Sequence, residues 1–248
     1  KKDFVKASEM QKATSVEFAQ LLEMCAIQFP KMRFRFSTSN PQDMHEEVLH
    51  VIAKYQNVCN YVHLPVQSGS TRILKEMNRQ HTREEYMTLV DKIKTIIPNV
   101  TISQDLIAGF PTETEEDHKD TLSLMEYVQY DFGYMFSYSE RPGTLAARKM
   151  EDDVPEEVKK RRLQEIVDLQ QKISETRTKR FVGEVVEVLI EKESKKSKEE
   201  WSGKNSENVV TVFPKENYKI GEFVNVLIKD CTGATLKGEA LGYSEVMN

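Results

Sequence analysis

The chain has 248 residues and a formal net charge of −5; 30% of its residues are charged and 39% are hydrophobic. These values are typical of a soluble globular protein with one large domain or two smaller ones. The acidic balance argues against a protein that binds nucleic acid over its whole surface, although it allows a local basic patch. No apolar stretch approaches the roughly 20 residues of a membrane span, and no signal-peptide pattern is visible. We expect a cytoplasmic protein that contacts no membrane.

Cysteine is sparse, with only Cys25, Cys59 and Cys231 in the chain. No two of them have the spacing of a metal site or a redox motif, so we interpret them as apolar thiols in a reducing compartment. The first residue is Lys1 rather than Met, which suggests that a native N-terminal part precedes this sequence.

The first 150 residues alternate between helical and strand patterns. A capping box at Thr82 and Glu85 opens one helix, and Thr114 caps another that has three acidic residues in its first turn. This alternation predicts a parallel sheet with right-handed crossovers, built from four β/α units. The expected order is helix 14–28, strand 32–37, helix 42–56, strand 61–66, short helix 70–78, helix 83–97, strand 100–107, helix 114–129 and strand 132–138.

The pattern changes after residue 150. A long charged helix is predicted over about 155–179, followed by β-branched runs with turn residues between them at 182–190, 208–213, 223–228 and 234–241. Such runs predict a compact all-β barrel. We therefore divide the chain into residues 1–150, a connecting helix at 151–180 and a β domain at 181–248, and interpret the Lys/Glu-rich stretch at 192–200 as a solvated loop.

Four of the predicted strands end in polar turns marked by Gly or Pro, at residues 34–41, 63–70, 102–111 and 135–144. The ends of successive parallel strands open on one rim, and ligands bind at that rim in such folds. One polar turn is common, but four in succession predict a site assembled from several strand ends.

The motifs in these turns resemble those of one family, the radical S-adenosylmethionine methylthiotransferases. The chain reads HLPVQSGS at 63–70, MNR at 77–79, TREEY at 82–86 and DLIAGFPTET at 105–114. The resemblance extends over essentially the whole chain, and the β domain resembles the family's TRAM domain, a small RNA-binding barrel. It implies a fold of α/β plus all-β class: a partial TIM-like (β/α) barrel, the radical SAM core lacking its first strands, followed by a TRAM β-barrel.

Two further motifs, YSERPGT at 138–144 and WSGKNSEN at 201–208, are most similar to the tRNA-modifying branch of the family. That branch adds a methylthio group to C2 of N6-isopentenyladenosine next to the anticodon. The family uses S-adenosylmethionine and two [4Fe-4S] clusters: a radical abstracts the C2 hydrogen, and the sulfur arrives from the second cluster. The cluster-binding cysteines of the family are absent here, so no catalytic residue or metal ligand is assigned and the chain alone is expected to be inactive.

The resemblance places S-adenosylmethionine at the rim turns. The hydroxyls, amide and carboxylate available there belong to Ser37, Thr38, Gln67, Ser68, Asp105 and Tyr138. For several of these residues a purely structural role stays open: Ser68 could cap a helix, and Asp105 could form a structural ion pair or a cap. His63, within a strand, is better explained as a hydrogen-bonded core histidine than as a ligand.

The expected RNA contacts are cationic or aromatic. The Arg141 guanidinium suits a phosphate or carboxylate, although a surface Arg in a turn is an equal alternative. A lysine-rich loop beside an aromatic ring suits stacking on a loop nucleotide. From residue 181 onwards, however, nine Lys face twelve Asp and Glu, so the β domain is not basic overall. The assigned contacts are Arg141, Lys195, Lys196, Lys198, Trp201 and Lys204.

The sequence therefore predicts the C-terminal part of a tRNA methylthiotransferase that acts as a monomer on the anticodon stem-loop with an electron donor protein. Two alternatives remain: an enzyme for threonylcarbamoyladenosine in tRNA or a ribosomal protein aspartate, and a non-catalytic RNA-binding module.

Overall fold

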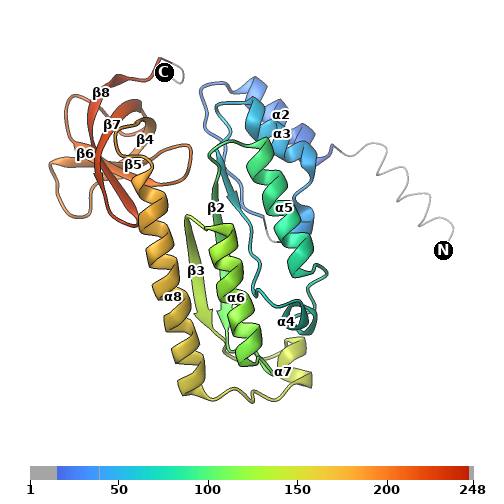
Figure 1. Cartoon of the computed structure of the whole chain (residues 1–248). Coiled ribbons are helices and arrows are strands. Elements are labelled where there is room, and N and C mark those ends of the chain that lie inside the picture. The colour runs from blue at the N-terminus through green and yellow to red at the C-terminus, as the bar shows by residue number, and fades with distance from the viewer. Residues whose placement is uncertain (1–15, 39, 246–248) are drawn as a thin grey trace.

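A computed structural model describes residues 16–38 and 40–245 of the chain (Figure 1). A small parallel sheet with helices comes first, and a closed barrel follows at the end of a long helix. The elements before the barrel are α2 (Phe18–Gln28), η1 (Pro41–Asp43), α3 (Glu46–Lys54), β1 (Tyr61–His63), α4 (Thr71–Glu76), α5 (Arg83–Ile96), β2 (Thr101–Ala108), α6 (Glu115–Val128), β3 (Phe132–Ser137), α7 (Leu145–Lys149) and α8 (Glu156–Lys179). The barrel strands are β4 (Val185–Glu193), β5 (Glu200–Lys204), β6 (Val210–Pro214), β7 (Phe223–Cys231) and β8 (Thr235–Tyr243).

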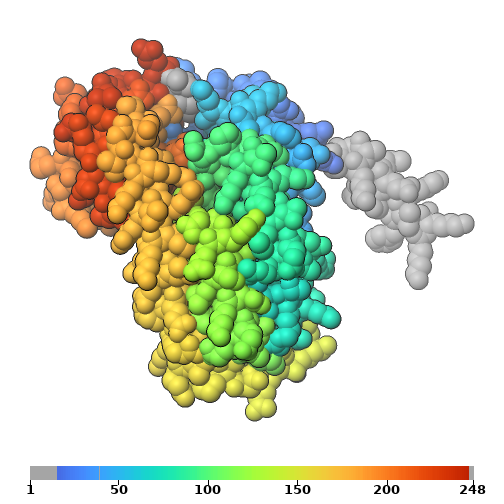
Figure 2. Space-filling model, viewed as in Figure 1, coloured from blue at the N-terminus to red at the C-terminus, as the bar shows by residue number. Residues whose placement is uncertain are grey.

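The sheet has the order β1-β2-β3 and is parallel throughout. Helix α8 packs on β2 and β3, and α6 lies between α8 and α5 (Figures 1 and 2). Side chains of β2 alternate between the two faces, so Gln104 reaches Gln170 of α8 while Asp105 points the other way. The face away from the helices therefore carries Asp105, together with His63 and Ser103, which contact it or each other.

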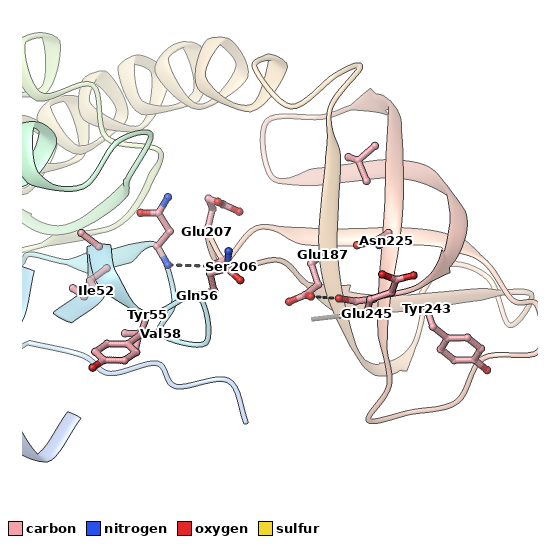
Figure 3. A pocket seen from close by; sticks show the side chains of 14 residues that line it. Ile52, Tyr55, Gln56, Val58, Glu187, Ser206, Glu207, Asn225, Tyr243 and Glu245 are labelled. Atoms are coloured by element: carbon pink, nitrogen blue, oxygen red, sulfur yellow. Dashed lines mark hydrogen bonds between the residues drawn. The ribbon is translucent and has the colours of Figure 1, made fainter. Parts of the chain in front are cut away.

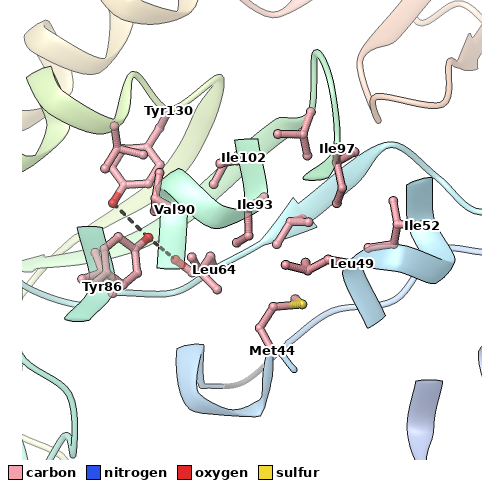
Figure 4. Packing of buried hydrophobic residues seen from close by; sticks show 14 of the residues in the cluster. Met44, Leu49, Ile52, Leu64, Tyr86, Val90, Ile93, Ile97, Ile102 and Tyr130 are labelled. Atoms are coloured by element: carbon pink, nitrogen blue, oxygen red, sulfur yellow. Dashed lines mark hydrogen bonds between the residues drawn. The ribbon is translucent and has the colours of Figure 1, made fainter. Parts of the chain in front are cut away.

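The core beneath the helices is mostly apolar, and a pair of buried tyrosine hydroxyls is hydrogen-bonded within it. Leu49, Ile93 and Ile102 are almost fully buried (Figure 4). The Tyr130 hydroxyl donates to the Tyr86 hydroxyl at 3.0 Å, and the Tyr86 hydroxyl donates to the Leu64 carbonyl at 2.9 Å. Burial raises the pKa of Tyr86. Each hydroxyl has a partner, so these two hydrogen bonds connect α5 to the residue after β1 without leaving an unsatisfied donor.

Two predicted strands are shorter than expected. The stretch 32–37 forms only one bridge, between Phe34 and Val58, so the sheet has three strands rather than four. The segment turns into Pro41, which has no N–H with which to extend a ladder. Strand β1 ends at His63 for the same reason, because Pro65 interrupts it; pairing resumes at a bridge between Gln67 and Leu106.

The predicted helix caps are confirmed. Thr82 and Thr114 each accept a hydrogen bond from the third helical N–H, and Glu85 and Asp117 complete the two capping boxes. The predicted helix at 14–28 begins outside the described residues; its described part is α2, whose apolar side chains Leu21, Met24 and Ile27 are exposed.

The barrel closes in the order β4-β5-β6-β8-β7 around Val188, Phe213 and Val226. Strand β5 was missed by the sequence analysis, because Glu-Trp-Ser-Gly-Lys has no β-branched run. It is held by antiparallel pairing with both β4 and β6. Gly203 permits the close approach, since a Cβ there would lie 2.0 Å from the Leu189 carbonyl oxygen. The predicted loop at 192–200 is correspondingly shorter.

Among the described residues, no helix has both the length and the apolar character that crossing a membrane requires.

Candidate functional site

A pocket of about 580 Å³ lies where the three strands of the sheet end. Four residues that the sequence analysis selected line it together: Gln67, Asp105, Tyr138 and Arg141. Phe110, Phe136 and Ile107 contribute apolar surface to it. The carboxyl ends of parallel strands meet at one edge, so the predicted rim is a real concavity with an amide, a carboxylate and a guanidinium around it.

The backbone places these side chains by pairing beyond the regular strands. The Gln67 N–H donates to the Asp105 carbonyl at 2.9 Å, with Gln67 at φ 75°. Gly109 has φ 73°, and its N–H donates to the Glu113 carboxylate at 2.7 Å. The Tyr138 N–H donates to the Ala108 carbonyl at 2.8 Å. These bonds make the polar turns rigid rather than loose.

Asp105 belongs to a polar chain on the open face of the sheet. Its carboxylate lies 3.5 Å from Nε2 of His63, and Nδ1 of His63 lies 2.8 Å from the Ser103 hydroxyl. The Ser103 and Tyr61 hydroxyls are 2.7 Å apart, and burial is the main cause that raises the pKa of Tyr61. His63 is thus hydrogen-bonded, as the sequence analysis expected of a structural histidine. One of its neighbours, Asp105, lines the pocket. The positive charge of Arg79 and the Asp105 carboxylate also attract each other.

Tyr138 forms the wall of the pocket nearest α8. Its ring meets Phe110 edge-on at 5.2 Å, and Nζ of Lys159 lies 5.6 Å from the ring centroid. Burial is the main cause that raises the pKa of Tyr138, with Asp152 adding to it. The Lys159 ammonium is buried but paired with Asp152 at 2.5 Å and Glu156 at 2.9 Å. The wall therefore presents a neutral phenol.

The other three residues expected to bind S-adenosylmethionine lie apart from this pocket. Ser37 is exposed, and the Thr38 hydroxyl donates to the His63 carbonyl at 2.6 Å. Ser68 is fully buried, and its hydroxyl accepts from the Ser70 N–H at 3.2 Å. Thr38 and Ser68 therefore have local structural roles in this arrangement, and none of the three lines the pocket.

The residues expected to contact RNA do not form one cluster. Lys195, Lys196 and Lys198 are exposed between β4 and β5, but Trp201 is half-buried against the barrel core with Nζ of Lys215 4.6 Å from its ring. Lys204, at the far end of β5, donates to Oδ1 of Asn208 at 3.0 Å and lines a second hollow beside β3. The sequence analysis missed strand β5, which separates Lys204 from the loop.

A third pocket, of about 620 Å³, lies between the α3–β1 region and the barrel (Figure 3). Ile52 and Tyr55 line one side, and Glu187, Glu207 and Glu245 contribute carboxylates on the other. Burial raises the pKa of Glu207. The Asn60 N–H donates to the Ser206 hydroxyl at 3.0 Å across this junction. The acidic lining disfavours phosphate, so this pocket is a poor RNA site.

The cysteines do not form a ligand set for a cluster. Cys25 lies on α2, Cys59 precedes β1 and Cys231 ends β7, and all three are free thiols. In the part of the chain that the structure describes, no group of three or more His, Cys, Asp or Glu side chains is arranged to hold a metal ion. These residues therefore do not fit an iron–sulfur cluster.

Comparison with known proteins agrees with these features. Residues 11–125 match the family model of the Radical SAM superfamily, and residues 179–241 match that of the TRAM domain. The chain is 72% identical over 246 residues to the tRNA-2-methylthio-N(6)-dimethylallyladenosine synthase of Flavobacterium psychrophilum, covering 99% of this chain and 51% of that protein. For the synthase of the same name from Christiangramia forsetii, the identity is 69% over 245 residues, with 99% and 51% covered.

The chain thus spans about half the length of the curated relatives it matches. Among solved structures, coproporphyrinogen III oxidase of Escherichia coli, a radical SAM enzyme, resembles this chain with a TM-score of 0.45 and 24% sequence identity. The matched region covers 54% of this chain and 31% of the oxidase chain. The resemblance drawn from the sequence motifs is confirmed by the family matches and the relatives.

Proposed function

This chain belongs to the radical SAM superfamily and ends in a TRAM domain, and on that premise we propose that it is part of a tRNA methylthiotransferase. The proposed reaction adds a methylthio group to C2 of N6-isopentenyladenosine, on the 3′ side of the anticodon. The observation that carries the proposal is the 72% identity, over 99% of the chain, with a synthase named for this product.

The rim pocket supports the proposal through the chemistry of its lining. A carboxylate at Asp105 suits an ammonium group or ribose hydroxyls, the Gln67 amide suits ribose or the methionine end, and Phe110 and Tyr138 offer an apolar wall. These groups fit S-adenosylmethionine, which supplies the radical and the methyl group in this chemistry. Within this chain, Gln67 and Asp105 would orient the cosubstrate, and the aromatic wall would exclude water.

The cluster ligands must come from residues other than those described here, since the three thiols lie on separate elements. We propose residues 1–150 as the C-terminal part of the radical SAM barrel, 151–180 as a connecting helix and 181–248 as the TRAM barrel. The proposed partners are the anticodon stem-loop of tRNA, contacted by Lys195, Lys196 and Lys198, and a protein electron donor. We further propose that it acts in the cytoplasm as a monomer.

The test is mass spectrometry of tRNA nucleosides from a strain that lacks the gene. We expect 2-methylthio-N6-isopentenyladenosine to disappear and N6-isopentenyladenosine to accumulate, with the wild-type gene restoring the product. Asp105→Asn should restore little of it, because the pocket loses its carboxylate, whereas Glu140→Gln, a change at an exposed neighbour, should restore it fully. An unchanged nucleoside profile in the deletion strain would refute the proposal.

A further inference from the structure

Strand β3 carries an aromatic side chain at every second position. Phe132, Tyr134 and Phe136 of the strand, and Tyr138 directly after it, alternate with Gly133, Met135 and Ser137. Alternate residues of a strand share one face. Met135 packs on the core beneath the helices, and a Cβ at Gly133 would collide with Gln104 on that side. The four aromatic rings, here termed the β3 stripe, therefore lie on the open face of the sheet.

Both outer rings of the stripe pack against another aromatic ring. Of the inner two, Tyr134 meets the His63 ring edge-on at 6.4 Å, but both inner rings stay largely exposed. Phe132 stacks on Tyr61 with ring centroids 5.6 Å apart and planes 11° apart, and Tyr138 meets Phe110 edge-on. Tyr134 and Phe136 are 56% and 54% exposed. The described residues thus leave two adjacent large rings uncovered, and covering them with a flat apolar ligand would be favourable.

Each end of the stripe opens into a hollow that contains a cationic side chain. Phe136, Tyr138 and Arg141 line the rim pocket. The second hollow, of about 230 Å³, receives Phe132, Tyr134 and Lys204. The stripe therefore runs from a lysine on the barrel to an arginine on the turn after β3.

Acidic groups near the stripe are engaged by cations. Asp131, at the Lys204 end, accepts from Arg177 at 3.0 Å and lies 3.1 Å from Arg180. Asp105, at the Arg141 end, is attracted to the charge of Arg79 and lies 3.5 Å from Nε2 of His63. Repulsion of an anionic ligand along the stripe is therefore reduced, and Lys204 and Arg141 are placed to contact negative charge.

We propose that Tyr134 and Phe136 stack unpaired bases of an RNA strand whose phosphates are contacted by Lys204 at one end and Arg141 at the other. A sheet face bearing exposed aromatic rings binds single-stranded RNA in this way, because every base has a π-face and the rings need not be rearranged. The inference rests on the proposed function and deepens it: the barrel and the rim pocket become two ends of one RNA path.

The test uses the intact protein and a short single-stranded RNA that carries 5-iodouridine, which forms photocrosslinks to stacked aromatic side chains. We expect crosslinks at Tyr134 and Phe136, located by mass spectrometry. Tyr134→Leu and Phe136→Leu keep an apolar side chain but remove the π-face. Each should weaken RNA binding roughly fivefold or more, since base–aromatic stacking contributes about 1–3 kcal/mol.

Three comparisons make the result specific. Tyr134→Phe keeps the ring and should bind as the wild type does. Tyr127→Leu removes an exposed tyrosine from α6, in the helical layer, and should also leave binding unchanged. Lys204→Gln and Arg141→Gln should each lower the slope of log affinity against log salt by about 0.7, the value for one phosphate contact on a single strand.

Two outcomes would overturn the proposal while leaving the proposed function intact. In the first, the leucine variants bind RNA normally and the wild type crosslinks elsewhere. In the second, crosslinks are absent and the leucine variants lower the thermal midpoint of the intact protein, which would show that another protein segment covers the rings. If the wild type binds no RNA at all, the proposed function fails with it.

Discussion

At the scale of single residues, the Asp117 carboxylate accepts several hydrogen bonds within the part of the chain that precedes the barrel, here called the sheet unit (residues 16–179). It is buried, accepts from the Ser70 hydroxyl at 2.6 Å and forms an ion pair with Arg72. Burial alone would raise the pKa of Asp117, but the hydrogen bonds from Arg72, Ser70 and Thr114 hold it well below its usual value. Since the folded-state pKa is depressed, this stabilisation is complete above the unfolded pKa of about 3.9 and is lost as the pH falls through the folded pKa.

We predict that Asp117→Asn lowers the free energy of unfolding by about 2 kcal/mol at neutral pH, because the charge-assisted bonds are lost. The difference from wild type should narrow as the pH falls below about 3.9. Urea denaturation across a pH series would measure it, with Asp120→Asn, an exposed change on the same helix, as the control. A difference that stays constant with pH would contradict this assignment.

At the scale of elements, the turn between β1 and α4 packs directly on the backbone of α6 at Gly69. Its N–H donates to the Thr121 hydroxyl at 2.9 Å, and a Cβ at this position would lie 2.4 Å from Cα of Thr121. Backbone cannot move aside as a flexible side chain can, so Gly69→Ala must push α6 away from the turn. We predict a loss of about 1–3 kcal/mol in the free energy of unfolding.

Gly233→Ala provides the matched control for this contact. Its added Cβ would lie 3.4 Å from Cγ of Glu175, which is an ordinary contact with a flexible side chain. The variant should therefore unfold within about 0.5 kcal/mol of the wild type. Equal losses in the two variants would show that close packing at Gly69 is not the cause.

The helices were easier to predict from sequence than the strands, for a physical reason. Helix starts depend on local caps, and the capping box at Thr82 and the cap at Thr114 both occur where the sequence indicated. Strands depend on distant partners: residues 32–37 have a strand-like pattern but pair only at Phe34, whereas β5 has a weak pattern and pairs on both sides. Local sequence does not contain that information.

The residues of the candidate site also differ in how well the sequence predicted them. Gln67 follows β1, Asp105 lies in the second half of β2, and Tyr138 and Arg141 follow β3, so strand order predicted that they would meet. Ser68 also follows a strand, but its side chain points into the packing of α4 rather than the pocket. The exposed rings of Tyr134 and Phe136 were missed, although alternate aromatic residues from 132 to 138 were a readable signal.

At the scale of the whole molecule, Arg33 fixes the barrel to the sheet unit. Its buried guanidinium donates to the Glu187 carboxylate at 2.6 Å and to the Lys204 carbonyl at 2.8 Å, and lies 4.8 Å from the Phe223 ring. Removing one partner of a buried ion pair leaves the other charge uncompensated. The RNA path inferred above depends on this junction, because Arg33 bonds the backbone of Lys204 itself.

We predict that Arg33→Gln destabilises the junction by about 3 kcal/mol and uncouples the barrel from the rest of the chain. Trp201, the single Trp of the 248 residues, reports the barrel by fluorescence, whereas far-UV circular dichroism is dominated by the helices of the other unit. The two denaturation curves should coincide for the wild type and for Lys31→Gln, an exposed neighbour, and should separate for Arg33→Gln. Curves that still coincide, with an unchanged midpoint, would mean that the contacts of Arg180 and Asn60 hold the units together without Arg33.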